Sequence, residues 1–258
     1  MTWKIKQFSN PKLKDPILIE GLPGIGNVGK IAVDFIIDNL KAKKLLQLYS
    51  KTLPHSVFVN EENLIELPLI EIYYKRLKDK DLLLLSGDVQ PLEETSCHEF
   101  CDTILDISEK YHSNEIITLG GIGLSNIPKD PRVFCTANNK DIMQKYRKKY
   151  KQMQNDAYAI IGPIVGVSGL LVGLAKERNI PAISLLTETY AHPAYIGIKS
   201  AKETLNVLNK TLNLNLNLEN LDNEIEEIEQ EFRKSEYLQK IQKIKRFKKS
   251  RRDISYIG

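Results

Sequence analysis

"IEGLPGIGNVGKIAVDF", residues 19–35, places a strand, a glycine-rich turn and an amphipathic helix in direct succession. The turn reads G-x-G-x-x-G from Gly24 to Gly29, and glycine suits such a turn because it accepts positive φ and lets backbones approach closely. The helix after it repeats apolar side chains at helical spacing, as expected for a face packed on a sheet. Those side chains are Val28, Ile31, Ala32, Phe35, Ile36 and Leu40. The stretch therefore predicts a strand–turn–helix unit.

The same alternation of short apolar runs and helical patterns continues along the chain. Apolar runs predict strands at 16–19, 44–49, 69–74, 82–85, 116–119, 157–161 and 182–186. Helical spacing predicts helices at 27–40, 95–111, 139–150, 167–178 and 199–212. Several strands are apolar throughout, which is typical of strands covered on both faces. The expected fold class is α/β, with a mostly parallel or mixed sheet wrapped by helices.

Composition narrows the possible functions. The chain has 258 residues, 42% of them apolar, which is enough for a sizeable core. Its net charge is only +4, from 37 basic and 33 acidic residues, so we expect no nucleic-acid partner. Three cysteines do not form a secreted disulfide framework. No apolar run approaches the roughly 18 residues of a membrane helix, and no signal sequence is visible, so we expect a soluble cytoplasmic protein without a membrane partner.

The C-terminal part differs from the rest. Residues 212–218 alternate Leu and Asn, which fits either a short edge strand or a linker. Residues 220–249 read as one long helix, with six acids within 221–231 and eight bases within 240–252. This helix could pack on the body as a solvated amphipathic helix or join subunits. We therefore predict an α/β core (1–215), a long charged amphipathic helix (216–250) and a flexible C-terminal docking tail (251–258).

The glycine turn resembles two nucleotide-binding motifs, and both fail. A dinucleotide site needs an acid roughly 20 residues on, yet no Asp or Glu lies between Asp38 and Glu61. A phosphate-binding loop needs Ser or Thr after the lysine, but Ile31 occupies that position and is expected to be buried against the sheet. Close packing is therefore the preferred role of these glycines. A residual possibility is an anion at the helix N-terminus.

Further glycine clusters, at Gly87, Gly120–Gly123 and 162–173, follow predicted strands, where α/β sheets form ligand crevices. They define a candidate ligand rim, made of Gly24, Gly26, Asp88 and Glu188. The alternative is structural: Asp88 as a turn residue and Glu188 paired with a neighbouring base. No catalytic or metal-binding constellation is visible, because the Cys97, His98 and Cys101 group has no fourth ligand and reads as buried thiols. We expect no cofactor and no metal.

Five segments, GLPGIGNVGKIA, GDVQP, TLGGIG, GVSGLLVGLA and LLTETYAHPAYIGIKSA, occur in this order between residues 21 and 201. Together they resemble the archaeal branch of the proteasome assembly chaperone family, over roughly residues 15–215. The resemblance implies an α/β core similar to that of purine nucleoside phosphorylases, without an established activity. It also implies a homo-oligomer that docks on the α-subunits of the proteasome core particle.

The family's contact element is a C-terminal sequence of hydrophobic residue, Tyr, then any residue. This chain ends in DISYIG, so Tyr256 is third from the end and Ser255 precedes it. On this resemblance, Tyr256, Ile257 and Gly258 are the expected contacts to a proteasome α-subunit. Tyr256 offers an apolar ring with a polar tip, and the basic run before it could steer the tail toward an acidic rim. The alternative is an inert terminus.

Two functions follow from the sequence. The first is a non-catalytic, homo-oligomeric protein that binds the proteasome. It would act as an assembly chaperone, as an activator, or as an adaptor that recruits substrates. The second is a phosphorylase- or hydrolase-like enzyme that binds a small anionic or nucleotide ligand at the strand-end glycine loops.

Overall fold

The computed structural model describes residues 3–151, 153, 162–219, 221 and 225. The chain divides into two compact units, Met1–Asn217 and Leu218–Gly258. The predicted strand at 157–161, nearly all of the predicted helix at 220–249 and the tail at 251–258 lie outside the described residues. The fold below is that of the first unit.

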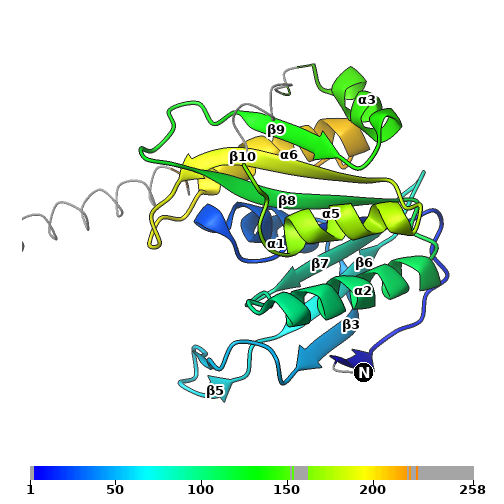
Figure 1. Cartoon of the computed structure of the whole chain (residues 1–258), viewed down its shortest axis with the longest axis vertical. Coiled ribbons are helices and arrows are strands. Elements are labelled where there is room, and N and C mark those ends of the chain that lie inside the picture. The colour runs from blue at the N-terminus through cyan, green and yellow to red at the C-terminus, as the bar shows by residue number, and fades with distance from the viewer. Residues whose placement is uncertain (1–2, 152, 154–161, 220, 222–224, 226–258) are drawn as a thin grey trace, which may run out of the picture. The chain divides into compact units, whose positions relative to one another are not determined.

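An eight-stranded mixed sheet forms the centre of this unit, in the order β1-β3-β6-β7-β2-β8-β10-β9 (Figure 1). The strands are β1 (Trp3–Gln7), β2 (Ile17–Gly21), β3 (Lys43–Ser50), β6 (Ile70–Lys75), β7 (Leu82–Gly87), β8 (Glu115–Leu124), β9 (Val133–Ala137) and β10 (Ala182–Tyr190). The four central strands β7, β2, β8 and β10 are parallel, while β1, β3, β6 and β9 pair antiparallel to their neighbours. The expected mixed α/β sheet is confirmed.

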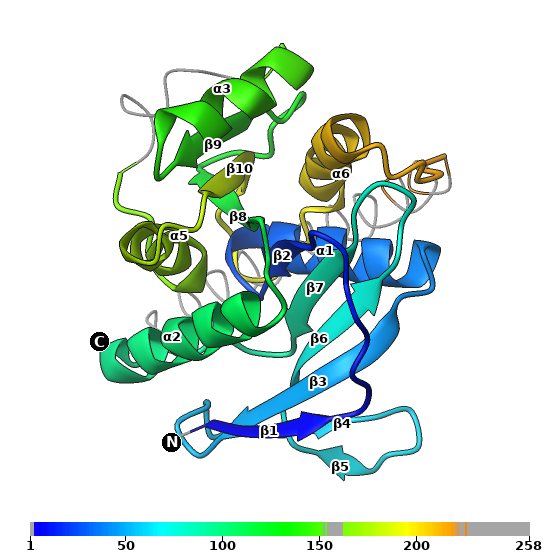
Figure 2. The ribbon, with the colours of Figure 1, turned by 90° about the vertical axis from the view of Figure 1, so that its right-hand side faces the viewer.

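Helices cover both faces of the sheet. They are α1 (Val28–Asn39), α2 (Glu94–Lys110), α3 (Lys140–Lys149), α5 (Val167–Glu177) and α6 (Ile198–Leu212), and their bounds agree with the predicted ranges to within one or two residues. Figure 2 shows α2 and α5 on one face, α1 and α6 on the other, and α3 beside β9. Because both faces are covered, β7 is buried along its whole length, as its LLLL run predicts.

Four short strands escaped the sequence prediction. β1 and β9 are the two edges of the sheet, and β4 (Phe58–Val59) and β5 (Ile65–Glu66) form a separate hairpin. In β1 only Trp3 is buried, and the two hairpin strands are exposed throughout. The apolar patterns by which the central strands are recognised are therefore weak in β1, β4 and β5, whereas β9 does carry a short buried run, Val133 to Cys135, that the prediction missed.

The glycine-rich turn between residues 24 and 29 forms the predicted connection between a strand and a helix. A 3-10 turn, Ile25–Asn27, connects β2 to α1, with Gly26 at φ 63° and Asn27 at φ 52° in the left-handed region. Gly29, in the first turn of α1, faces β8: a Cβ there would lie 2.5 Å from the carbonyl oxygen of Leu119. The packing role is thus visible for Gly26 and Gly29, whereas Gly24 is exposed and a Cβ there would meet no atom within 4 Å.

The buried face of α1 is rotated by about one residue from the predicted stripe. Its buried residues are Val28, Gly29, Ala32, Val33, Ile36 and Ile37, whereas Ile31 is only half-buried. The expectation of a buried Ile31 was wrong, because the close approach of Gly29 to β8 turns that side of the helix inward. The phosphate-loop motif still fails for lack of a hydroxyl after Lys30.

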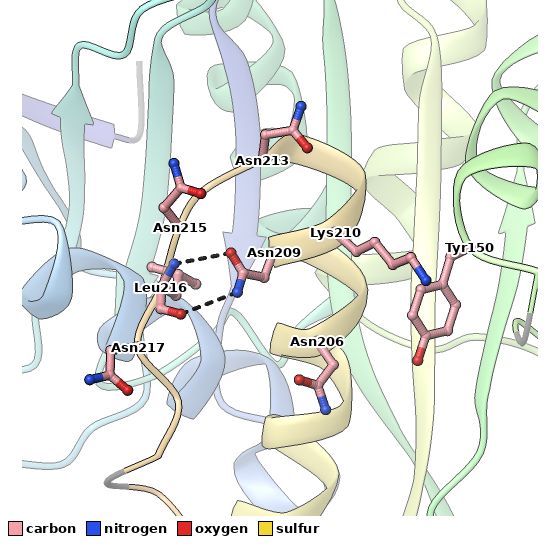
Figure 3. Close-up of a pocket in the computed structure, with 8 residues that line it drawn as sticks. All are labelled: Tyr150, Asn206, Asn209, Lys210, Asn213, Asn215, Leu216 and Asn217. Carbon is pink, nitrogen blue, oxygen red and sulfur yellow. Dashed lines mark hydrogen bonds between the residues drawn. The ribbon is translucent and has the colours of Figure 1, made fainter.

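The Leu–Asn segment after α6 is an irregular segment packed on the body. Leu212, Leu214 and Leu216 are buried, and Asn213 and Asn215 adopt left-handed φ values of 54° and 55°. The side-chain amide of Asn209 holds the return of the chain (Figure 3): its Oδ1 accepts from the Leu216 N–H at 3.0 Å and its Nδ2 donates to the Leu216 carbonyl at 3.2 Å. The strict alternation thus combines buried leucines with asparagines that tolerate positive φ.

Candidate functional site

A cavity of about 370 Å³ opens at the carboxyl ends of the parallel strands, where α/β sheets bind ligands. Three glycine-containing segments line it: the turn at Leu22–Gly29, the end of β8 at Leu119–Gly123, and Gly162–Ser168. Gln90 ties two of these segments together. Its Nε2 donates to the Pro23 carbonyl at 2.7 Å, and its Oε1 accepts from the Val167 N–H at 3.3 Å.

Glu20 lies fully buried at the end of β2 and was not anticipated from the sequence. Its carboxylate accepts from the N–H of Leu22 at 3.0 Å and from the hydroxyl of Ser168 at 3.0 Å. The pairing of β2 with β8 ends at Glu20 and Thr118. The Glu20 side chain therefore supplies hydrogen-bond acceptors at the point where the two strands separate. Burial raises the pKa of Glu20 to about 7, although hydrogen bonds from Leu22, Ser168 and Leu119 oppose the shift. The one available signal was an acid inside the apolar run ILIEG.

Ser168 links Glu20 to the cavity. The residue stands in the first turn of α5 and lines the cavity, while its Oγ also lies 3.2 Å from the Leu119 carbonyl oxygen. Among the described residues that line this cavity, none is His, Cys, Lys, Arg, Asp or Glu. A serine needs an adjacent base to become a nucleophile, and the titratable group that the structure places next to the Ser168 hydroxyl is the buried carboxyl of Glu20, 3.0 Å away.

The four residues of the predicted rim do not form one site. Gly24 lines the cavity, and Gly26 is buried beside it, where a Cβ would lie 2.6 Å from the Thr189 hydroxyl oxygen. Asp88 lies in a separate depression between α1 and β6, and its Oδ2 accepts from the Leu69 N–H at 3.0 Å. Its position matches the alternative role of a turn residue. Whether Gly24 and Gly26 bind a ligand stays a prediction.

Glu188 is held by Arg132. The Arg132 Nε lies 3.0 Å from both carboxylate oxygens, the backbone N–H of Arg132 donates to Oε2 at 3.0 Å, and the guanidinium Nη2 completes the ion pair. Burial pushes the pKa of Glu188 upward, but the hydrogen bonds and charge of Arg132 outweigh burial and leave it below its usual range. The structural alternative for Glu188, a partner base, therefore matches the geometry.

The three cysteines lie in the interior of the protein. Cys97, Cys101 and Cys135 are buried free thiols, whereas His98 is exposed. Within the described ranges no group of three or more His, Cys, Asp or Glu residues is arranged to hold a metal ion. Nor does any helix among these residues combine the length and apolarity needed to cross a membrane.

With the fold and cavity defined, the chain can be placed in a family. The PAC2 family model matches residues 18–236, and this protein belongs to the PAC2 family. The resemblance found in the sequence is confirmed.

Individual relatives agree with this placement. The chain is 35% identical to the archaeal proteasome activator PbaB of Pyrococcus furiosus, with a TM-score of 0.83 over 92% of this chain and 100% of PbaB. It shares the fold of Pyrococcus furiosus PbaA, an archaeal homolog of proteasome-assembly chaperone, at a TM-score of 0.75 and 23% identity over the whole of both chains. It is also 31% identical to the uncharacterized protein MJ1210 of Methanocaldococcus jannaschii, over 86% of this chain and 82% of that protein.

Proposed function

We propose that this protein is a non-catalytic, homo-oligomeric partner of the proteasome core particle that assists its assembly or its activity. The observation that carries the proposal is the likeness to PbaB, which spans the whole of that activator at 35% identity. Identity at this level over 92% of this chain supports a shared binding role. The protein would act in the cytoplasm, through a contact surface for another protein and without a cofactor.

The cavity chemistry supports binding rather than catalysis. Both candidate rim carboxylates are engaged in local structure, Asp88 by the Leu69 N–H and Glu188 by Arg132. The Glu20 carboxylate supplies hydrogen-bond acceptors where the pairing of β2 with β8 ends. Structural roles for these three acids favour binding over the enzyme alternative, for which the Ser168–Glu20 pair is the remaining candidate.

The contact with the proteasome is assigned to the tail. Tyr256 and Ile257 would enter a pocket on an α-subunit, since an aromatic ring with a polar tip and an adjacent aliphatic side chain are suited to such pockets. Gly258, which has no side chain, would let the backbone at that position approach the α-subunit closely. The eight bases within 240–252 would speed the encounter with an acidic rim.

Binding to the proteasome tests the proposal. The full-length protein is immobilised, and an archaeal proteasome core particle and isolated α-subunits are passed over it in separate runs. We expect measurable affinity for at least one of them. Preference for the core particle, with faster peptide hydrolysis, would indicate an activator, and preference for free α-subunits would indicate an assembly role. Absence of binding to both would contradict the proposal.

A further inference from the structure

Two exposed surfaces of the first unit are complementary to each other. The first, the hairpin surface, comprises residues 57–67 around β4 and β5. The second, the β1 edge, comprises Lys4–Phe8 and is one border of the eight-stranded sheet. Both lie at the same end of this unit in two perpendicular views (Figures 1 and 2).

The hairpin surface combines a well-formed turn with exposed apolar side chains. The Asn60 side chain organises the turn, since its Oδ1 accepts from the N–H groups of Glu62 and Leu64 at 3.0 and 2.9 Å. Six apolar side chains on it are 43–71% exposed: Val57, Phe58, Val59, Leu64, Ile65 and Leu67. A two-stranded hairpin is marginally stable alone, and a patch of this kind marks a protein interface.

Charge and hydrogen bonding indicate what covers the hairpin surface. Residues 57–67 carry three acids, Glu61, Glu62 and Glu66, and no base. The β1 edge carries exposed Lys4 and Lys6, together with Ile5 and Phe8, each 47% exposed. Within the described chain, the outer edges of β1 and β5 have no strand partner. Edges of this kind bind by adding a strand from another chain.

The alternation of side chains matches between β1 and β5. Successive residues of a strand point to opposite faces, so Ile65 and Leu67 share one face of the hairpin and Glu66 lies on the other. In β1, Trp3 and Ile5 share one face and Lys4 and Lys6 the other. Pairing β5 with β1 can therefore set apolar side chains beside apolar ones and Glu66 beside the lysines.

Self-pairing of β1 would be unfavourable by the same reasoning. Two antiparallel copies of β1 would bring Lys4 and Lys6 of one chain opposite those of the other, and like charges across strands destabilise a pair.

We propose that copies of this chain associate by pairing β5 of one copy with β1 of another. The contact joins different elements of the two copies, so it either occurs twice about a two-fold axis or continues around a ring. The inference deepens the proposed function, because it rests on the homo-oligomer that the function assumes and assigns its interface.

The oligomer mass of the full-length protein tests this interface by light scattering after gel filtration and by sedimentation at several concentrations. Ile65→Ser should raise the dissociation constant by about tenfold or more, because the Ile65 side chain is buried only in the complex. Ile196→Ser, an exposed isoleucine outside both surfaces, serves as the matched control and should leave the mass unchanged.

A charge exchange tests the pairing itself. Glu66→Lys and Lys6→Glu should each weaken association, and the variant that carries both substitutions should recover it. A monomeric wild-type protein, or an oligomer insensitive to Ile65→Ser and to both charge reversals, would overturn the inference. Proteasome binding is measured separately: a monomer that binds the core particle would refute the interface and the homo-oligomer but not the proteasome partnership, and an oligomer that does not bind would refute the partnership alone.

Discussion

Gly29→Ala is expected to lower the free energy of unfolding by about 3 kcal/mol. This value is at the upper end of the usual cost of adding a methyl group where atoms are already closely packed. The added Cβ would lie 2.5 Å from the carbonyl oxygen and 3.0 Å from the carbonyl carbon of Leu119. Backbone atoms of a central strand cannot move aside as a flexible side chain can, so α1 must shift away from the sheet. Denaturant unfolding of both proteins measures the difference.

Gly173→Ala is the matched control, since it makes the same chemical change within a helix. A Cβ at Gly173, in α5, meets no atom within 4 Å. Alanine should therefore raise the stability by up to about 1 kcal/mol through its helix propensity. Equal effects of the two substitutions, or a neutral Gly29→Ala, would refute the packing role of the glycine motif.

The second large effect is the pH dependence that Glu20 gives to stability. Its pKa is raised from about 4.5 to about 7 by burial, so the folded protein holds a proton that the unfolded chain releases more easily. This contribution is fully present below about pH 4.5 and is lost as the pH rises through about 7. Over that window the loss should be on the order of 3 kcal/mol.

Glu20→Gln isolates this contribution, because glutamine cannot ionise and Ser168 can both accept from its amide and donate to the Leu119 carbonyl. The difference in unfolding free energy between wild type and variant should change by that amount between pH 4.5 and 8, in the variant's favour. Any constant offset from the new amide cancels in this comparison. Glu177→Gln, an exposed position at the end of α5 and outside both proposed contact surfaces, is the control. A difference that does not vary with pH would contradict the buried-carboxyl assignment.

Much of the fold could be predicted from the sequence, because the central elements carry strong patterns. The LLLL run of β7 and the glycine turn before α1 reflect burial and backbone geometry that local sequence encodes directly. Edge elements such as β1 owe their structure to pairing with β3, which no local pattern reveals. The rotation of α1 likewise depends on the contact between Gly29 and Leu119, far apart in the chain.

The candidate site was less predictable for a related reason. Glu20 is defined by where two parallel strands part, and Glu188 by a partner 56 residues away. Sequence identified Glu188 as a charged residue near a strand end and could not name Arg132 as its partner. The family resemblance is carried instead by several short segments that occur in a fixed order along the chain.

The proposed contact between the C-terminal tail and the proteasome is tested most directly by a truncation. Full-length protein and a variant lacking residues 256–258 are compared for binding to the same archaeal proteasome core particle, with their oligomer masses measured in parallel. We predict that the truncated protein keeps its oligomer mass and loses binding. Binding of equal affinity by the truncated protein would contradict the assignment of Tyr256, Ile257 and Gly258 as the proteasome contact.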